Sequence, residues 1–241
     1  MVKIVCAILC YNNSKIIQKL INDIKSFNKI NKIDLIFIDD FSKDNTKDII
    51  LSNNLKIIKH NTNLGYGAAV KSAFGYGIKN KKDFLLIFPG DYQRSLKDLE
   101  LMIKLSNQNK FDLISGSKFK KIKLLPKHRK FGNLIYSKLA KYLWKSELED
   151  VLSGFKSYKI KKFKNIIKEL PDNYSFDIVL SQIISRKKIL CKEFDAEVKY
   201  NKETTQMKSF FHLGKKNILY IGFNMFIITL YKFIKLNLFK N

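Results

Sequence analysis

Leu35-Ile36-Phe37-Ile38-Asp39-Asp40-Phe41-Ser42 is a short apolar run that ends in two adjacent carboxylates. An apolar run of this length is typical of a strand that is buried on both faces of a sheet. Two adjacent carboxylates cannot both be buried without partners, so they need a nucleobase edge, a ribose hydroxyl or a metal ion. Alternatively they cap the next helix, a role that Asp44 and Thr46 would share. The residues alone leave both interpretations open.

The same pattern recurs on both sides of this stretch. Apolar runs predict strands at residues 2–9, 35–38, 55–58, 84–88 and 112–115. Helical periodicity predicts helices at residues 16–27, from 44 onward, and at 68–78, 96–105, 131–143 and 176–184. Residues 118–130 are predicted to form a basic loop, and residues 149–155 a turn. The alternation predicts an α/β fold with a Rossmann-like, mainly parallel sheet flanked by helices, in which ligands bind beyond the carboxyl ends of the strands.

The C-terminal segment differs from the rest of the chain. Residues 218–231 are apolar and uncharged, and lysines flank them on both sides. A bilayer span needs about 20 apolar residues, so an interfacial helix, a short span and a buried helix all stay open. We expect residues 1–212 to form a catalytic domain and residues 213–241 a hydrophobic or amphipathic, membrane-associating helical tail.

The charge of the chain favours anionic partners. Its 46 Lys and Arg against 21 Asp and Glu give a net charge of +25. Nucleotide phosphates and lipid headgroups fit this excess, whereas lysines that are scattered rather than striped argue against nucleic acid. The three cysteines have no metal-like spacing, and no signal-peptide pattern is evident at the N-terminus. We therefore expect a cytoplasmic location, at the face of a membrane.

Two further polar segments follow predicted strands. The glycines of residues 63–71 allow close backbone approach at a helix start, where Lys71 could add a charge toward a diphosphate. Tight packing of Ala68 and Ala69 explains those glycines equally well. Asp91 and Gln93 offer oxygen ligands for Mg²⁺ or Mn²⁺, although Pro-Gly-Asp is also ordinary turn chemistry.

Taken together, these segments carry a specific resemblance that runs over most of residues 1–210. The matching segments are Tyr11-Asn12, IDDFSKDNT at 38–46, NLGYGAAVK at 63–71, GDYQ at 90–93 and DVLSGFK at 150–156. In this order they resemble the family 2 glycosyltransferases, and within them the dolichol- and polyprenyl-phosphate sugar synthases. The resemblance implies a GT-A fold, an inverting hexosyltransferase and a divalent metal, Mg²⁺ or Mn²⁺. It also implies a UDP- or GDP-sugar donor.

The resemblance assigns a role to each matching position. Asp91 and Gln93 would sit at the metal and the diphosphate. Asp150 would lie near the acceptor, as the general base if that acceptor is a sugar hydroxyl. The residues expected to bind the nucleotide sugar are Tyr11, Asn12, Asp39, Asp40, Lys71 and Gln93. The basic residues expected near acceptor phosphates are Arg129, Lys156, Lys202 and Lys208.

The chain departs from the family pattern at three points. Pro89 replaces the first acid of the Asp-x-Asp metal motif, Phe41 replaces the glycine of Asp-Asp-Gly-Ser, and Thr205-Gln206-Met207 replaces Gly-x-Ser. We expect transfer to a polyprenyl phosphate. The alternatives are transfer to a saccharide hydroxyl in cell-surface glycan synthesis, and a catalytically weak protein that binds nucleotide sugars.

Overall fold

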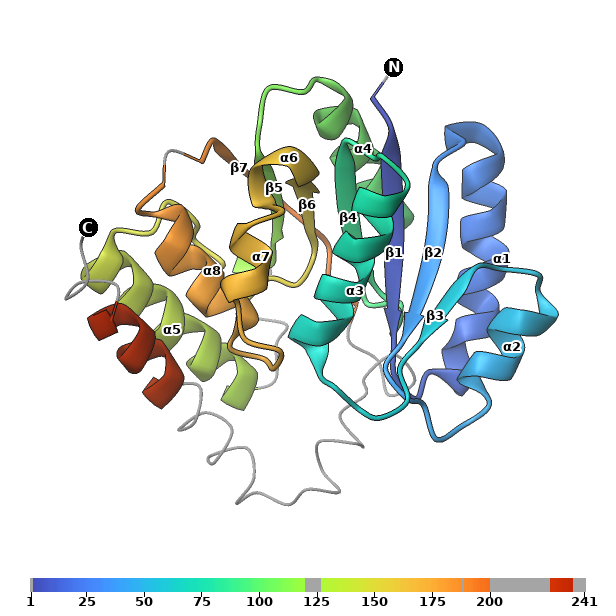
Figure 1. The fold of residues 1–241 in the computed structure, drawn as a ribbon, viewed down its shortest axis with the longest axis horizontal. Helices are drawn as coiled ribbons and strands as arrows, with labels where there is room; N and C mark the ends of the chain where they lie inside the picture. The colour runs from blue at the N-terminus through green and yellow to red at the C-terminus, as the bar shows by residue number, and fades with distance from the viewer. Residues whose placement is uncertain (1, 120–126, 188, 200–225, 236–241) are drawn as a thin grey trace.

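The computed structural model describes residues 2–119, 127–187, 189–199 and 226–235. Its centre is a seven-stranded sheet in the order β3-β2-β1-β4-β6-β5-β7, shown in Figure 1. The strands are β1 Ile4–Cys10, β2 Asp34–Asp39, β3 Ile57–Lys59, β4 Phe84–Pro89, β5 Leu113–Ser117, β6 Lys156–Lys159 and β7 Cys191–Asp195. All neighbouring strands pair in parallel except β6, which pairs antiparallel with both β4 and β5. The expected α/β fold with a mainly parallel sheet is confirmed.

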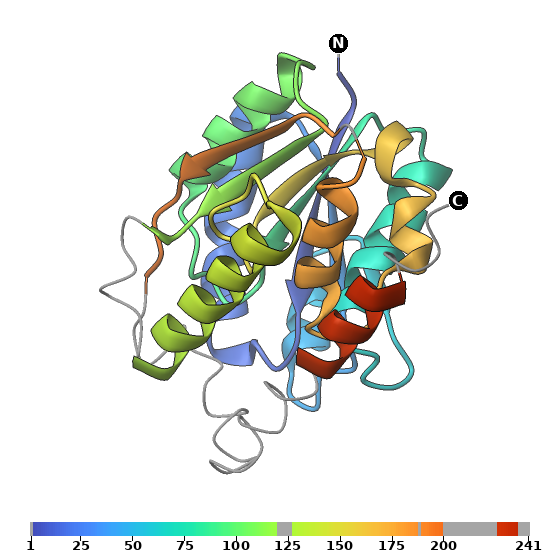
Figure 2. The ribbon, with the colours of Figure 1, turned by 90° about the vertical axis from the view of Figure 1, so that its left-hand side faces the viewer.

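Helices cover both faces of this sheet (Figure 2). They are α1 Ser14–Asn31, α2 Thr46–Ser52, α3 Tyr66–Lys79, α4 Leu96–Asn107, α5 Lys127–Trp144, α6 Ile160–Phe163, α7 Ile166–Glu169 and α8 Phe176–Ile184. Residues 226–235 are also helical. The first three turns of α1 bury Ile16, Ile17, Leu20, Ile21 and Ile24, which follow the spacing of one helical face.

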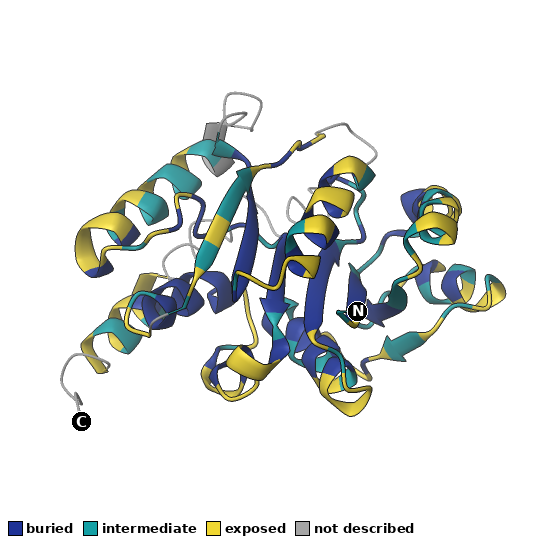
Figure 3. Cartoon of the chain, turned by 90° about the horizontal axis from the view of Figure 1, so that it is seen from above, coloured by how far each residue is buried: buried dark blue, intermediate teal, exposed yellow. Residues whose placement is uncertain are grey.

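The hydrophobic core has two parts, one on each side of the sheet. Along β1, Val5 and Ala7 contribute to the cluster under α3 and α8, whereas Cys6 and Ile8 contribute to the cluster under α1 and α4. Successive side chains of a strand point to opposite faces, so a strand covered on both faces must be apolar throughout. Figure 3 shows the central strands as a buried layer between helices whose outer sides are exposed.

The structure differs from the sequence prediction at several boundaries. The strand expected at residues 55–58 is Ile57–Lys59, and the basic loop expected at 118–130 gives way to α5 at Lys127. The strands β6 and β7 were not predicted. Their sequences, KSYK and CKEFD, mix charged and apolar residues and contain no apolar run that marks a buried strand.

The helical residues 226–235 pack beside α5 (Figures 1 and 2). The rings of Trp144 and Phe233 have centroids 6.0 Å apart. The Gln182 side-chain amide donates a hydrogen bond of 2.9 Å to the backbone oxygen of Thr229. Residues 213–225 and 236–241 of the expected tail lie outside the described residues. Within the described ranges, no helix has both the length and the apolar character needed to cross a bilayer.

Candidate functional site

The loops that follow β1 and β2 are joined by hydrogen bonds at the carboxyl edge of the sheet. The backbone N–H of Asn12 donates to Ser42 Oγ at 3.0 Å, and the Asn12 side-chain oxygen accepts from Lys43 N–H at 2.8 Å. The backbone N–H of Asn13 donates to Thr46 Oγ1 at 2.7 Å. These contacts bring the expected nucleotide-binding segments 11–12 and 39–46 together and hold their backbones in place.

Asp39 ends β2 and is fully buried. Its carboxylate accepts a hydrogen bond from the hydroxyl of Ser42, and a second one from the backbone N–H of Ser42 at 3.3 Å. The alternative role, as part of a helix cap, belongs to Asp44 instead. Asp44 accepts from the N–H groups of Ser14 and Thr46, each at 3.0 Å. Asp39 is therefore not part of a helix cap.

Asp39 and Asp91 share one edge of the sheet. β1 lies between their strands, with Cys10 paired to Asp39 and Leu9 paired to Pro89. Burial raises the pKa of the Cys10 thiol well above its usual value, and the charges of Asp39 and Asp91 raise it further. Because β2 and β4 both run parallel to β1 and end beside its carboxyl end, Asp39 and the turn that carries Asp91 lie at the same edge of the sheet. The two acids thus follow strands that flank β1, and a donor pocket shared between them stays a prediction.

Asp91 and Gln93 form the turn after β4. The backbone N–H of Gln93 donates to Asp91 Oδ1 at 3.1 Å, and the Gln93 backbone oxygen accepts from Lys199 N–H at 2.9 Å. Between them Tyr92 takes a positive φ of 55° and donates its hydroxyl to Asp23 at 2.5 Å. Burial and this bond raise the pKa of Tyr92 to about 12. The turn is thus anchored at the two residues that follow Asp91.

This turn supplies only part of a metal-binding set. Among the described residues, no three His, Cys, Asp or Glu side chains cluster in a way that could hold a metal ion. Mg²⁺ commonly keeps several waters and uses one or two protein carboxylates together with substrate phosphates. One carboxylate and one amide at residues 91 and 93 therefore fit a divalent ion that the donor's own diphosphate helps to coordinate.

Asp40 has a different role from Asp39. Its Oδ1 lies 2.7 Å from His60 Nδ1 and accepts from Leu64 N–H at 2.9 Å, and its Oδ2 accepts from Gly65 N–H at 2.8 Å. The side chain is buried, so these bonds use its oxygens inside the protein. Asp40 thus holds the glycine-containing loop in place. We expect it to act on the nucleoside only through that loop.

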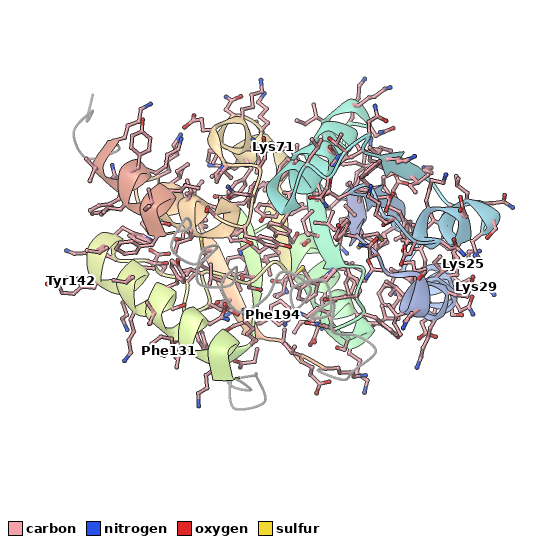
Figure 4. All side chains as sticks on the ribbon, turned by 90° about the horizontal axis from the view of Figure 1, so that it is seen from below. Lys25, Lys29, Lys71, Phe131, Tyr142 and Phe194 are labelled. Atoms are coloured by element: carbon pink, nitrogen blue, oxygen red, sulfur yellow. The ribbon has the colours of Figure 1, made fainter. Side chains whose placement is uncertain are left out.

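The glycine-containing loop packs against the chain before α8. A Cβ added at Gly67 would lie 2.2 Å from the backbone oxygen of Pro171, and the backbone oxygen of Asp172 accepts from Ala68 N–H at 3.1 Å. Lys71 Nζ lies 2.7 Å from Asp172 Oδ1. Figure 4 views the sheet edge where the parallel strands end, and Lys71 is labelled there. Of the two interpretations left open, close packing accounts for Gly67, and Lys71 is engaged by Asp172.

A buried ion pair lies after β5. Both oxygens of Asp150 lie 2.9 Å from Lys118 Nζ, and Asp150 Oδ2 accepts from Lys118 N–H at 3.1 Å. Burial raises the pKa of Asp150, but Lys118 outweighs this and holds the pKa below its usual value. Glu193 accepts hydrogen bonds from the backbone N–H groups of Glu149 and Asp150 at 2.8 and 3.0 Å. Asp150 is thus an ionised, doubly anchored carboxylate.

A second buried ion pair changes the interpretation of Lys156. This side chain is fully buried at the start of β6, and its Nζ lies 2.8 Å from Asp177 Oδ1. It also donates to the backbone oxygen of Ser153. The ammonium group of this lysine has no exposed surface and is paired inside the protein, as a buried charge requires. The prediction that Lys156 contacts an acceptor phosphate does not agree with this placement.

The other predicted basic residues are not placed. Lys202 and Lys208 lie outside the described residues, and Arg129 lies in the first turn of α5, where only the backbone is described. Tyr11 is half-buried and donates its backbone N–H to Asn13 Oδ1 at 2.9 Å.

The sequence patterns did not indicate four residues that hold this region together: His60, Lys118, Asp177 and Glu193. Lys118 directly follows the last residue of β5. The rule that selected Asp39 and Asp91, namely polar residues at carboxyl ends of strands, would have found it.

Comparisons with known proteins match most of this chain. Residues 6–167 match the family described as Glycosyl transferase family 2. An uncharacterized protein of Methanocaldococcus jannaschii is 24% identical, over 90% of this chain and 98% of its own. The UDP-N-acetylglucosamine–dolichyl-phosphate N-acetylglucosaminyltransferase of Methanococcus voltae is 25% identical, over 66% of this chain and 70% of its own.

The fold also matches solved structures. Glucosyl-3-phosphoglycerate synthase from Mycobacterium tuberculosis, in complex with UDP, superposes with a TM-score of 0.60 at 14% identity. The match covers 83% of this chain and 73% of that one. The same enzyme with Mn²⁺ and UDP-glucose superposes with a TM-score of 0.57.

Proposed function

The chain belongs to the family 2 glycosyl transferases, and we propose that it moves a sugar from a nucleotide-sugar donor to a polyprenyl phosphate at the cytoplasmic face of a membrane. The donor part of this proposal rests on one observation. Asp39 and Asp91 lie at the same edge of the sheet, on either side of β1. Two acids at the tips of strands that flank one central strand can hold a nucleotide at its base and at its diphosphate.

In this proposal the donor lies across the loops after β1, β2 and β4. Tyr11, Asn12 and Asp39 contact the nucleoside, while Asp91 and Gln93 face the diphosphate. A divalent ion held by Asp91, Gln93 and the diphosphate would supply positive charge to the leaving group. Neighbours of similar fold solved with Mn²⁺ support such an ion.

The reaction is a single displacement with inversion. An acceptor oxygen forms a bond to the anomeric carbon of the sugar, and the bond from that carbon to the diphosphate oxygen breaks. The electron pair leaves with the nucleoside diphosphate. The hydrogen-bonded loops after β1 and β2 and the anchored turn after β4 would contribute mainly by positioning the donor.

The state of Asp150 favours a phosphate acceptor over a hydroxyl acceptor. A hydroxyl must lose a proton as it attacks, so its enzyme needs a general base whose pKa lies near the working pH. Lys118 holds the pKa of Asp150 below the usual value, and the carboxylate is fully buried. A phosphate oxygen is already an anion and needs no such base. The named activity of the Methanococcus voltae relative supports the same choice.

The test has two stages. A thermal-shift screen of UDP-, GDP- and dTDP-sugars with and without Mn²⁺ identifies the donor. The labelled donor is then incubated with polyprenyl phosphate, and the product is extracted into organic solvent. Label in the organic phase supports the proposal. Label transferred only to a water-soluble glycan, or donor binding without any transfer, contradicts it.

Matched variants connect this activity to the site. Asp91→Asn should abolish transfer while leaving the unfolding temperature unchanged. Asp48→Asn, at a side chain that is 67% exposed on α2, should leave both unchanged. Near-normal turnover by Asp91→Asn would refute its assigned role.

A further inference from the structure

We propose that α5 and the helical residues 226–235 form one face that docks on an anionic lipid bilayer. This proposal rests on the membrane location given above and names the surface that achieves it. The two helices lie side by side along one flank of the molecule (Figures 1 and 2). We call this surface the two-helix face.

Exposed apolar side chains are concentrated on the two-helix face. Soluble proteins expose single apolar residues throughout their surface, but contiguous patches mark interaction sites. More than half of the large, exposed apolar side chains in the described residues belong to these two helices. They are Phe131, Ile135, Tyr142 and Leu143 on α5, and Phe226, Ile227, Leu230, Tyr231 and Ile234 on the second helix.

Four exposed residues of α5 form one stripe. Phe131, Ile135, Lys138 and Tyr142 follow one another at intervals of three or four residues. Phe131 and Tyr142 are the most exposed of the apolar ones, at 68% and 84%. Figure 4 labels them at the two ends of the helix. The stripe thus combines three large apolar groups with one lysine.

The second helix is apolar on its inner and outer sides. Its inner side contacts the domain through the buried Thr229 and through Phe233, which packs on Trp144. Its outer side exposes Ile227, Tyr231 and other apolar residues where a surface helix of a soluble protein carries charges. A helix that exposes this many apolar side chains is stabilised when its outer side is covered as well. We infer that a second apolar medium meets the outer side.

Charge identifies that medium as an anionic membrane. Neither segment contains Asp or Glu, and together they carry seven Lys or Arg residues. Lys138, Lys141 and Lys235 are exposed beside the apolar groups. Lysines attract anionic headgroups while their stems stay among apolar groups. A symmetric contact with a second copy would instead bring like charges together.

Docking in this way places the candidate site close to the lipid. The first turn of α5 lies at the same edge of the molecule as the carboxyl end of β1 (Figure 2). That edge also carries Asp39 and Asp91. A lipid-linked acceptor could then reach the site without leaving the membrane.

The test measures flotation of the full chain with lipid vesicles, without donor or acceptor. We compare vesicles of phosphatidylcholine with vesicles that also contain phosphatidylglycerol. The parent should bind the anionic vesicles and lose that binding in high salt. The double variant Phe131→Ser, Tyr142→Ser should bind them about tenfold or more weakly, because two apolar anchors are lost. The matched control is Ile30→Ser, at an apolar side chain that is 83% exposed on α1. It should bind like the parent.

Three outcomes would overturn the proposal: unchanged vesicle binding by the double variant, equal binding to neutral vesicles, or a parent dimer in ultracentrifugation that the double variant dissociates. Donor-induced thermal shifts, measured without lipid, separate this test from that of the catalytic proposal. Normal shifts in both variants show intact folds, so that a failure of vesicle binding concerns the two-helix face alone. If the donor causes no thermal shift in the parent, that result contradicts the proposed donor and does not bear on the two-helix face.

Discussion

Asp40 accepts a hydrogen bond from the backbone N–H of Gly65 at 2.8 Å, and so ties the tip of β2 to the residue before α3. The same carboxylate also holds His60 and Leu64. One buried side chain therefore fixes the position of a whole loop at the edge where the donor is proposed to bind.

Replacing Asp40 by Asn should lower the free energy of unfolding by about 2 kcal/mol. The amide group has one accepting oxygen where the carboxylate has two, so a buried donor is left without a partner. Urea denaturation measures the loss. Asp48→Asn is the exposed control and should stay within about 0.5 kcal/mol of the parent. If Asp40→Asn lowers the free energy of unfolding by only about 0.5 kcal/mol or less, as expected for the exposed control, the anchoring role is contradicted.

Two glycines of α3 should respond to alanine in opposite directions. Gly67→Ala should destabilise the protein by about 3 kcal/mol or more, because the new methyl group meets the Pro171 backbone oxygen at 2.2 Å. Gly75→Ala should stabilise it by about 0.5–1 kcal/mol, because nothing lies within 4 Å of the added Cβ and alanine favours a helix. Thermal unfolding of both variants checks this. Similar effects at the two positions would show that the packing on Pro171 is not tight.

Asp150 should contribute to acid sensitivity. Its folded pKa lies below the unfolded value of about 3.9. It therefore adds stability that is present above about pH 4 and is lost as the pH falls through the folded pKa. The free energy of unfolding of Asp150→Asn should start lower and fall less steeply below pH 4 than that of the parent. Equal slopes in urea denaturation across this range would rule out the contribution.

Pro89→Asp should strengthen metal binding. It places a second carboxylate two residues before Asp91, and more carboxylate ligands raise the affinity for a hard cation. We expect Mn²⁺ to bind about tenfold more tightly in the presence of the donor nucleotide. A titration of Mn²⁺ followed by thermal shift measures this, with Pro126→Asp as the control for the added charge. An unchanged affinity for Mn²⁺ would show that the ion does not bind beside residues 89 and 91.

Much of the fold could be predicted because β1, β2 and β4 are apolar on both faces. β6 could not, since Lys156 and Ser157 are polar residues buried by specific partners. The Asp177 carboxylate pairs with Lys156, and the hydroxyl of Ser106 lies 2.8 Å from that of Ser157. A periodicity argument counts such residues as exposed. The partners that make their burial possible are remote in sequence.

At the site, the sequence located the acids correctly at one sheet edge but did not distinguish their tasks. Asp39 and Asp40 are adjacent, yet only the folded chain brings His60 and Gly65 to Asp40. Phe41 shows a related limit. It has a positive φ of 63° where the resembling motif has glycine, and Lys43 lies 4.3 Å from the centre of its ring. The motif indicated the backbone conformation, but not the residue that adopts it.

The antiparallel strand β6 also sets an order of assembly for the chain. β3, β2, β1 and β4 pair only with one another until Lys156 has been synthesised, because β5 joins β4 only through β6. In a ribosome-bound chain that ends before β6, the native pairings leave β4 as an edge strand, in addition to β3, and leave β5 without a neighbour. Open edges invite pairing with other chains. The short, lysine-bounded strand at Lys156–Lys159 thus covers the open edge of β4, and the edge of β5 waits for β7.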